Sequence, residues 1–146
     1  MNSERKIVWS WAFYDWANSA FSTTVMAGFF PIFFEKFWSN PEDVIQSTYQ
    51  LGWANSIASI IIAAISPFLG AVADRGSAKK KFLFIFAFLG IIMTGGLWMV
   101  EQGEWQMAIA VYVIASIGFM GGNIFYDSLL PSIASNEKVD YVSSLG

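Results

Sequence analysis

Residues 13–22 are Phe13-Tyr14-Asp15-Trp16-Ala17-Asn18-Ser19-Ala20-Phe21-Ser22, and Asp15 is the only charged residue between Lys6 and Glu35. An uncharged run of this length is typical of a membrane-spanning helix, in which an ionised side chain near the bilayer centre costs roughly 2.5–3.5 kcal/mol. On helical spacing, the polar residues of the stretch share one face. They are Asp15, Asn18, Ser19 and Ser22. The stretch therefore predicts a first helix whose polar stripe turns away from lipid.

The composition indicates a membrane protein. Of the 146 residues, 55% are hydrophobic and only 13% are charged, whereas soluble domains carry about 25% charged residues. The absence of cysteine excludes disulfides and thiol chemistry, and the absence of histidine removes the commonest metal ligand and the usual proton shuttle. We find no phosphate-binding glycine loop and no catalytic triad, and we expect neither enzyme activity, nor a cofactor or metal, nor a nucleic-acid partner.

Four long apolar runs predict an all-α transmembrane fold within one partial N-terminal domain, residues 1–146. The predicted spans are about 7–34, 44–73, 82–100 and 105–126. The first span would be about 42 Å long as a helix, which exceeds the hydrocarbon core of ~30 Å, so we expect it to tilt or to project beyond the bilayer.

Small and polar residues mark the faces on which these helices are expected to pack. The second run carries a stripe that includes Gly52, Asn55 and Ser59, and we interpret this stripe as close helix packing. The fourth run carries a glycine cluster and, separately, a polar face. The glycines are Gly118, Gly121 and Gly122, and the polar face is formed by Tyr112, Ser116 and Asn123.

The distribution of basic residues predicts the orientation. Seven Lys and Arg residues fall on the side of the N-terminus and the 74–81 turn, whereas Lys36 alone falls on the other side. The positive-inside rule then places both ends of the chain and the 74–81 turn in the cytoplasm.

The turn after the second run resembles the loop between helices 2 and 3 of major facilitator superfamily transporters. Residues 70–75 are Gly70-Ala71-Val72-Ala73-Asp74-Arg75, and Lys79-Lys80-Lys81 follow. The resemblance implies a cytoplasmic gate motif made of Gly70, Asp74, Arg75, Lys79 and Lys80. Ser77 and Ala78 stand where the superfamily pattern has a glycine and a basic residue. The alternative is a basic loop that serves only topology.

Three further segments resemble one branch of that superfamily, the vacuole effluxer-like family, also called the unknown major facilitator family. They are residues 11–21, residues 123–131 and residues 142–146. The resemblance covers the whole chain, but only about the first third of a twelve-helix transporter. It implies further transmembrane helices in a full-length protein, and an integral protein of the bacterial inner (cell) membrane.

The resemblance also implies secondary transport of a small solute by alternating access, with amino-acid efflux as the candidate activity. Helices 1 and 4 line the central cavity in the superfamily fold. The candidate substrate or proton cavity therefore comprises Asp15, Asn18, Ser22, Tyr112, Ser116 and Asn123. A structural Asp15, hydrogen-bonded to neighbouring helices or lying near the cytoplasmic interface, is the alternative.

Two other classes of function fit the same residues. One is a self-contained four-helix exporter of the small multidrug type, which would act as a dimer with an acid in its first helix. The other is a membrane scaffold or assembly subunit that transports nothing. In each of these classes, as in a transporter, the lipid bilayer is the expected surrounding of the chain.

Overall fold

The computed structural model describes residues 3–74, 78–134, 139–143 and 145, and all of the regular structure in them is helical. The first stretch is continuous and comprises α1 (Ser3–Ala20), the π-helix η1 (Phe21–Phe29), α2 (Phe30–Phe33) and the π-helix η2 (Phe34–Trp38). The elements that follow are α3 (Val44–Asp74), α4 (Lys79–Gly96), the 3₁₀ turn η3 (Leu97–Met99), α5 (Trp105–Ile133) and α6 (Val139–Ser143).

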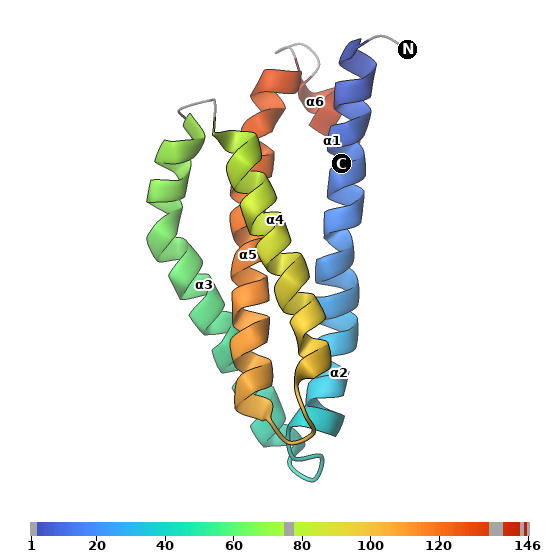
Figure 1. The fold of residues 1–146 in the computed structure, drawn as a ribbon, viewed down its shortest axis with the longest axis vertical. Helices are drawn as coiled ribbons and strands as arrows, with labels where there is room; N and C mark the ends of the chain where they lie inside the picture. Colours follow the sequence, from blue (N-terminus) through green and yellow to red (C-terminus); the bar gives the residue numbers. More distant parts are fainter. Residues whose placement is uncertain (1–2, 75–77, 135–138, 144, 146) are drawn as a thin grey trace.

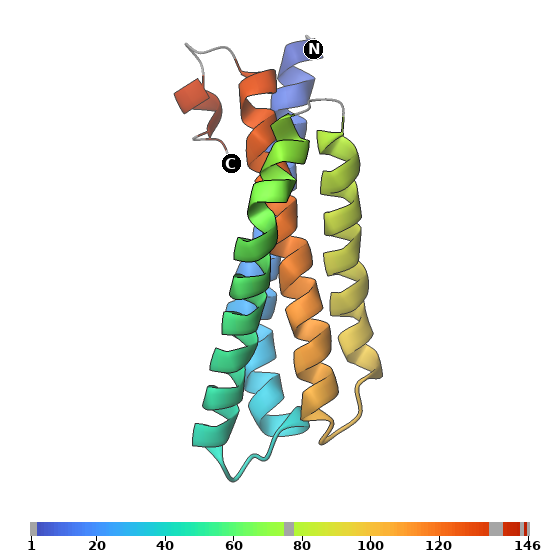
Figure 2. The same cartoon turned by 90° about the vertical axis from the view of Figure 1, so that its left-hand side faces the viewer.

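Long helical stretches run up and down in a bundle around α5 (Figures 1 and 2). α5 makes extensive contacts with α4 and α3 and fewer with α1. The turns at residues 39–43 and 100–104 lie at one end of the bundle, here called the Trp38 end. The start of α1, the end of α3, the start of α4 and the end of α5 lie at the other end, here called the Lys79 end.

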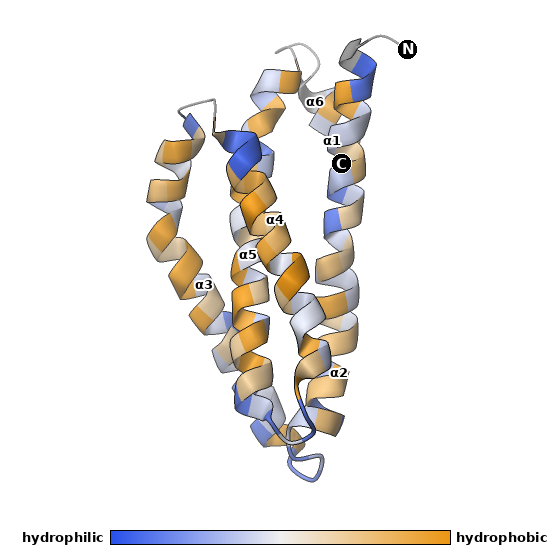
Figure 3. Cartoon of the chain, viewed as in Figure 1, coloured by the Kyte–Doolittle hydropathy of each residue, from blue (hydrophilic) through white to orange (hydrophobic). Residues whose placement is uncertain are grey.

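Three helices in the described part of the chain are long and apolar enough to cross a membrane. They are Val44–Asp74, Lys79–Met99 and Trp105–Ile133, and apolar residues dominate all three (Figure 3). The protein is thus an all-α integral membrane protein. The first stretch is not one of these three helices. Its α-helical part, Ser3–Ala20, carries several charged residues and gives way to π-helix after 18 residues. The first stretch nevertheless runs beside the other helices from one end of the bundle to the other (Figure 1), and the four predicted span boundaries stay predictions.

Glycines bring the backbones of α4 and α5 into contact. A Cβ atom at Gly118 would lie 2.6 Å from the backbone nitrogen of Gly90, and one at Gly121 would lie 2.5 Å from the ring of Phe86. Since lipid supplies no hydrophobic driving force between helices, close backbone approach is a main source of their association. The structure thus gives the glycine cluster of the fourth run the packing role expected of it.

The change from α-helix to π-helix in the first stretch has local causes. The hydroxyls of Ser22 and Thr23 both donate to the Ser19 carbonyl, over 3.1 and 3.0 Å. Pro31, which has no N–H to donate, lies shortly beyond the π-helical segment. Gly28 fits within this segment because a Cβ there would come within 3.2 Å of the Thr23 carbonyl oxygen. The helix therefore remains unbroken across residues 21–29 with a wider turn.

Buried hydrogen bonds fasten the Trp38 end. The indole N–H of Trp38 donates to the Val100 carbonyl (3.2 Å), which ties the first stretch to the turn before α5. The Ser39 hydroxyl donates to the Gln50 side-chain carbonyl (3.0 Å) and accepts from the Ser47 hydroxyl (3.0 Å), and all three side chains are buried. These bonds join the first stretch to the start of α3.

The fourth helix is longer than its predicted span. We expected it to close near Asp127, with Pro131 ending the helix or starting a separate interfacial piece, but α5 continues through both residues to Ile133. Pro131 removes one backbone donor from the last turns. The amide of Ala134 still donates to the Leu130 carbonyl (3.1 Å), so the helix ends only after another turn.

The glycine contact yields a stability prediction. Gly118→Ala places a methyl group against the Gly90 backbone, where no flexible side chain can move aside, and should destabilise the bundle by about 1–3 kcal/mol. Gly95→Ala is the matched control, because nothing lies within 4 Å of its Cβ position and alanine favours the helix. Thermal unfolding in detergent of the full reading frame that contains this chain measures both variants. Equal midpoints for the two variants would contradict the close packing.

Candidate functional site: the polar contacts of α1 with α5

An amide pair joins the two helices that carry the predicted cavity residues. The Asn18 side-chain amide donates to the Asn123 side-chain carbonyl over 2.8 Å. Both side chains are partly buried, and they come from residues 105 positions apart. The Asn18 side-chain oxygen and the Asn123 side-chain nitrogen take no part in this bond. They remain available as an acceptor and a donor for another polar group.

Asp15 lies one helical turn before Asn18 in α1 and is half-buried. It comes four residues after Trp11, whose backbone carbonyl accepts from the Tyr126 hydroxyl, and Asp127 follows Tyr126 in α5. An acid in each of two contacting membrane helices is costly when ionised, and a proton or a cation neutralises it.

Aromatic rings of α1 pack on Tyr126 of α5. The ring of Tyr126 stacks on Trp11 at a centroid distance of 4.5 Å and on Tyr14 at 5.2 Å. The Tyr126 hydroxyl also donates to the Trp11 backbone carbonyl over 3.3 Å. Tyr126 is thus held against α1, although it was not among the predicted site residues.

The remaining predicted cavity residues lie elsewhere. Ser22 donates to the Ser19 carbonyl of its own helix. Tyr112 is buried against Phe30 at a ring distance of 3.9 Å, and its hydroxyl donates to the Asn55 side-chain carbonyl over 3.0 Å. Ser116 is fully buried next to Tyr112. The structure therefore separates Tyr112 and Ser116, which lie in the apolar core near the Trp38 end, from the pair formed by Asn18 and Asn123.

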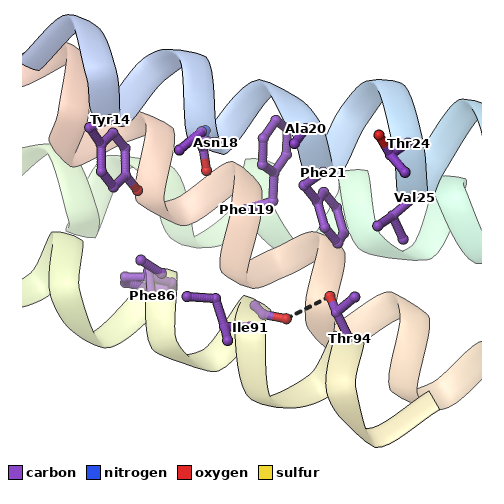
Figure 4. A pocket seen from close by; sticks show the side chains of 13 residues that line it. Tyr14, Asn18, Ala20, Phe21, Thr24, Val25, Phe86, Ile91, Thr94 and Phe119 are labelled. Carbon is purple, nitrogen blue, oxygen red and sulfur yellow. Dashed lines mark hydrogen bonds between the residues drawn. The ribbon is translucent and has the colours of Figure 1, made fainter. Parts of the chain in front are cut away.

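A cavity of about 550 Å³ lies between α1 and α4, with α5 behind it (Figure 4). Of the six predicted cavity residues, Asn18 is the one that lines it. Its other walls are largely aromatic and aliphatic, and include Phe21, Phe86 and Ile91. The Thr94 hydroxyl, at the far end of the cavity, donates to the Gly90 carbonyl of its own helix (2.7 Å). The cavity is thus mostly apolar, and Asn18, Tyr14, Thr24 and Thr94 supply its polar side chains.

The predicted gate motif lies at the Lys79 end. The ammonium of Lys79 donates to the Ser128 carbonyl of α5 over 2.7 Å. That carbonyl lies three residues before Pro131, in the region where a proline weakens the hydrogen bonds of a helix. Asp74 is exposed at the end of α3, Gly70 has nothing within 4 Å of its Cβ position, and Lys80 is exposed. Arg75 lies outside the described residues.

Sequence reasoning assigned Asn55 to helix packing, and its bond with Tyr112 is such an interhelical contact. Tyr126 and Trp11 were passed over because an aromatic residue near a membrane interface is ordinarily part of the interfacial belt. The only signal for Tyr126 was its position beside Asp127, in the segment that resembles the effluxer-like family. Nothing in the sequence indicated the bond between Lys79 and Ser128.

Comparison with known proteins relates the sequence of this chain to one family. The profile of the family described as "Vacuole effluxer Atg22 like" matches residues 3–48 and 44–143. A relative from Bacillus subtilis (strain 168), "Uncharacterized MFS-type transporter YxiO", is 36% identical over 138 residues, which cover 94% of this chain and 32% of the relative. "Autophagy-related protein 22" of Pichia angusta is 26% identical over 106 residues, which cover 73% of this chain and 18% of that protein.

A third relative is an "Uncharacterized protein" of Aquifex aeolicus (strain VF5), 28% identical over 94% of this chain and 33% of the relative's length. The chain thus spans a third or less of the curated relatives it matches. No solved structure matches it.

A double-mutant cycle on Asn18 and Asn123 measures their bond. Interhelical hydrogen bonds in membrane proteins contribute about 0.6 kcal/mol on average and at most about 1.7. Asn18→Ala and Asn123→Ala should each lower the free energy of unfolding, and the double variant should lose less than their sum by about this amount. Unfolding of the full reading frame in mixed micelles gives the three values. Strict additivity would show that the two amides do not interact.

Proposed function

Because this chain belongs to the vacuole effluxer Atg22-like family, we propose that it forms the first helices of a secondary transporter that moves a small solute across a membrane by alternating access. The relatives, of which the chain spans a third or less, favour this proposal over a self-contained four-helix exporter. The remaining transmembrane helices of the full-length protein then complete the pathway.

The observation that carries the proposal is the row of polar contacts between α1 and α5. Asn18 bonds Asn123, the Tyr126 hydroxyl bonds the Trp11 carbonyl, and the acids Asp15 and Asp127 lie in the same two helices beside these bonds. Ionisable and amide groups within membrane helices are costly and mark substrate, ion or proton pathways. We assign Asp15 and Asp127 to the binding of a proton or cation, and the amide pair to the solute.

The free groups of the amide pair suit an amino acid. An amide N–H of Asn123 can donate to a carboxylate, and the Asn18 carbonyl oxygen can accept from an ammonium group. A zwitterion needs both kinds of partner, and a neighbouring acid such as Asp15 adds attraction for its ammonium group. Ser22, Tyr112 and Ser116 keep the predicted place in the cavity wall only if α1 and α5 rearrange during transport.

We further propose that the Lys79 end is cytoplasmic and that the membrane is the inner (cell) membrane of a bacterium. The count of basic residues supports this orientation. The gate motif then lies at the cytoplasmic mouth, where the bond from Lys79 to α5 favours one conformation and the exposed Asp74 is available to the opposing half of the transporter. The role of Arg75 in the gate follows from the resemblance alone.

Asp15→Asn tests the proton or cation role. The amide has nearly the same size and shape as the carboxyl group but cannot be ionised, so solute transport should lose its dependence on pH or fall by at least tenfold. The measurement is the pH profile of amino-acid flux in liposomes that contain the full-length protein. Glu42→Gln, an exposed acid in the turn at the Trp38 end, is the control. A profile identical to the wild type would leave Asp15 a structural residue.

Lys79→Gln tests the gate. A hydrogen bond from a charged group contributes about 1.5–3 kcal/mol, so its loss should shift the balance between conformations by tenfold or more and slow transport without preventing insertion. Lys81→Gln removes an equal charge from an exposed position of the same turn. Flux and membrane insertion are measured together, and equal flux in both variants would exclude a gating role for the Lys79 bond.

A further inference from the structure

A single groove runs between α1 and α4 from the Lys79 end toward the middle of the bundle. A second cavity, of about 410 Å³, lies at its mouth and shares Tyr14 with the 550 Å³ cavity. On α4, the lining residues continue from Lys80 and Leu83 through Phe86 to Ile91, along one helical face. The two cavities are therefore successive parts of one groove.

The mouth of the groove is basic and polar. Lys6 comes from α1 and Lys80 from α4, so the two cations face the same cavity from opposite walls. Ser10 adds a hydroxyl, and no acidic residue is among the described residues that line this cavity. This end of the groove presents donors and positive charge to an anion.

Below the mouth, the groove is apolar. Phe21, Phe86, Ile91 and Phe119 supply most of its surface (Figure 4). From Tyr14 to Val25 the lining follows the end of α1 and the start of η1 over eleven residue steps, or at most about 16 Å at the α-helical rise, which is close to the depth of one leaflet of a ~30 Å hydrocarbon core. The α4 wall carries exposed Phe84, Phe88 and Ile92 outside the groove, so this helix faces the bilayer.

We propose that this groove binds one anionic phospholipid, with the phosphate-bearing headgroup between Lys6 and Lys80 and an acyl chain along the apolar part toward Ile91. Two cations at a membrane surface followed by an apolar channel match the two ends of such a molecule. Basic pockets between transmembrane helices are suited to anionic headgroups, and Trp11, Tyr14 and Tyr126 suit the interface at which a headgroup lies. A free phosphate ion would use the mouth but leave the apolar part unused.

The test uses the full-length protein in detergent with equimolar phosphatidylglycerol and phosphatidylcholine, and native mass spectrometry of the lipids retained. The wild type should retain phosphatidylglycerol at least tenfold over phosphatidylcholine. Lys6→Gln/Lys80→Gln should abolish that preference. The control, Lys36→Gln/Lys81→Gln, removes the same charge from exposed lysines outside the groove and should keep it. Ala87→Trp, which fills the apolar part, should reduce retention of both lipids while leaving the lysines in place.

Four results would overturn the proposal. The first is equal retention of the two lipids by the wild type, which is also expected if another helix of the full-length protein fills the groove. The second is a loss of the preference for phosphatidylglycerol in Lys36→Gln/Lys81→Gln that equals the loss in Lys6→Gln/Lys80→Gln. The third is displacement of phosphatidylglycerol by millimolar inorganic phosphate, which would indicate an anion site alone. The fourth is unchanged retention in Ala87→Trp. None of these readouts depends on transport, so they leave the proposed function untouched.

Discussion

The crossing of α4 and α5 at Gly90 and Gly118 is the contact on which the rest of the bundle depends. Because the two backbones touch, α5 is fixed against α4, and its opposite faces become available to α1 and α3. A membrane provides no hydrophobic gain for helix association, so this contact relies on dispersion and shape. Any larger residue at Gly118 would separate the helices and move Asn123 and Tyr126, which lie on the next turns of the same helix.

The contact of α1 with α5 is of a different kind. It is made mainly by polar groups and stacked rings, and α1 makes few backbone approaches to α5. Contacts of this kind stabilise a helix pair while leaving it able to shift, since an amide or a carboxylate can exchange one partner for another. The π-helical turns of residues 21–29 begin just after Asn18, so the helix changes register next to the interface that holds the polar groups.

The sequence predicted the fold well, whereas its candidate site residues stay a prediction. Uncharged runs located the apolar helices, because length and hydropathy alone decide whether a helix can span a membrane. The glycines of α5 were correctly interpreted as packing residues, since little else explains three glycines in one helix. Helical spacing placed Asn18 and Asn123 on polar faces, but spacing within a helix cannot reveal which faces meet. The bond of Lys79 and the continuation of α5 past Pro131 arise from tertiary contacts and local compensation, which no pattern of residues encodes.

The two ends of the bundle are held with unequal strength. At the Trp38 end, α3 buries Ser47, Gln50, Ala54 and Ala58, and side-chain bonds join it to the first stretch. Beyond Ala58, Ala73 is the one residue buried among the described residues of α3, and the helix leans away from α5 (Figure 1). Segments with few buried contacts open at the lowest free energy. Movement of α3 against α5 is therefore easiest at the Lys79 end, where Lys79, the first residue of α4, supplies a side-chain bond to α5. A lysine that bonds α5 and follows shortly after the loosely packed end of α3 is placed to couple the two helices.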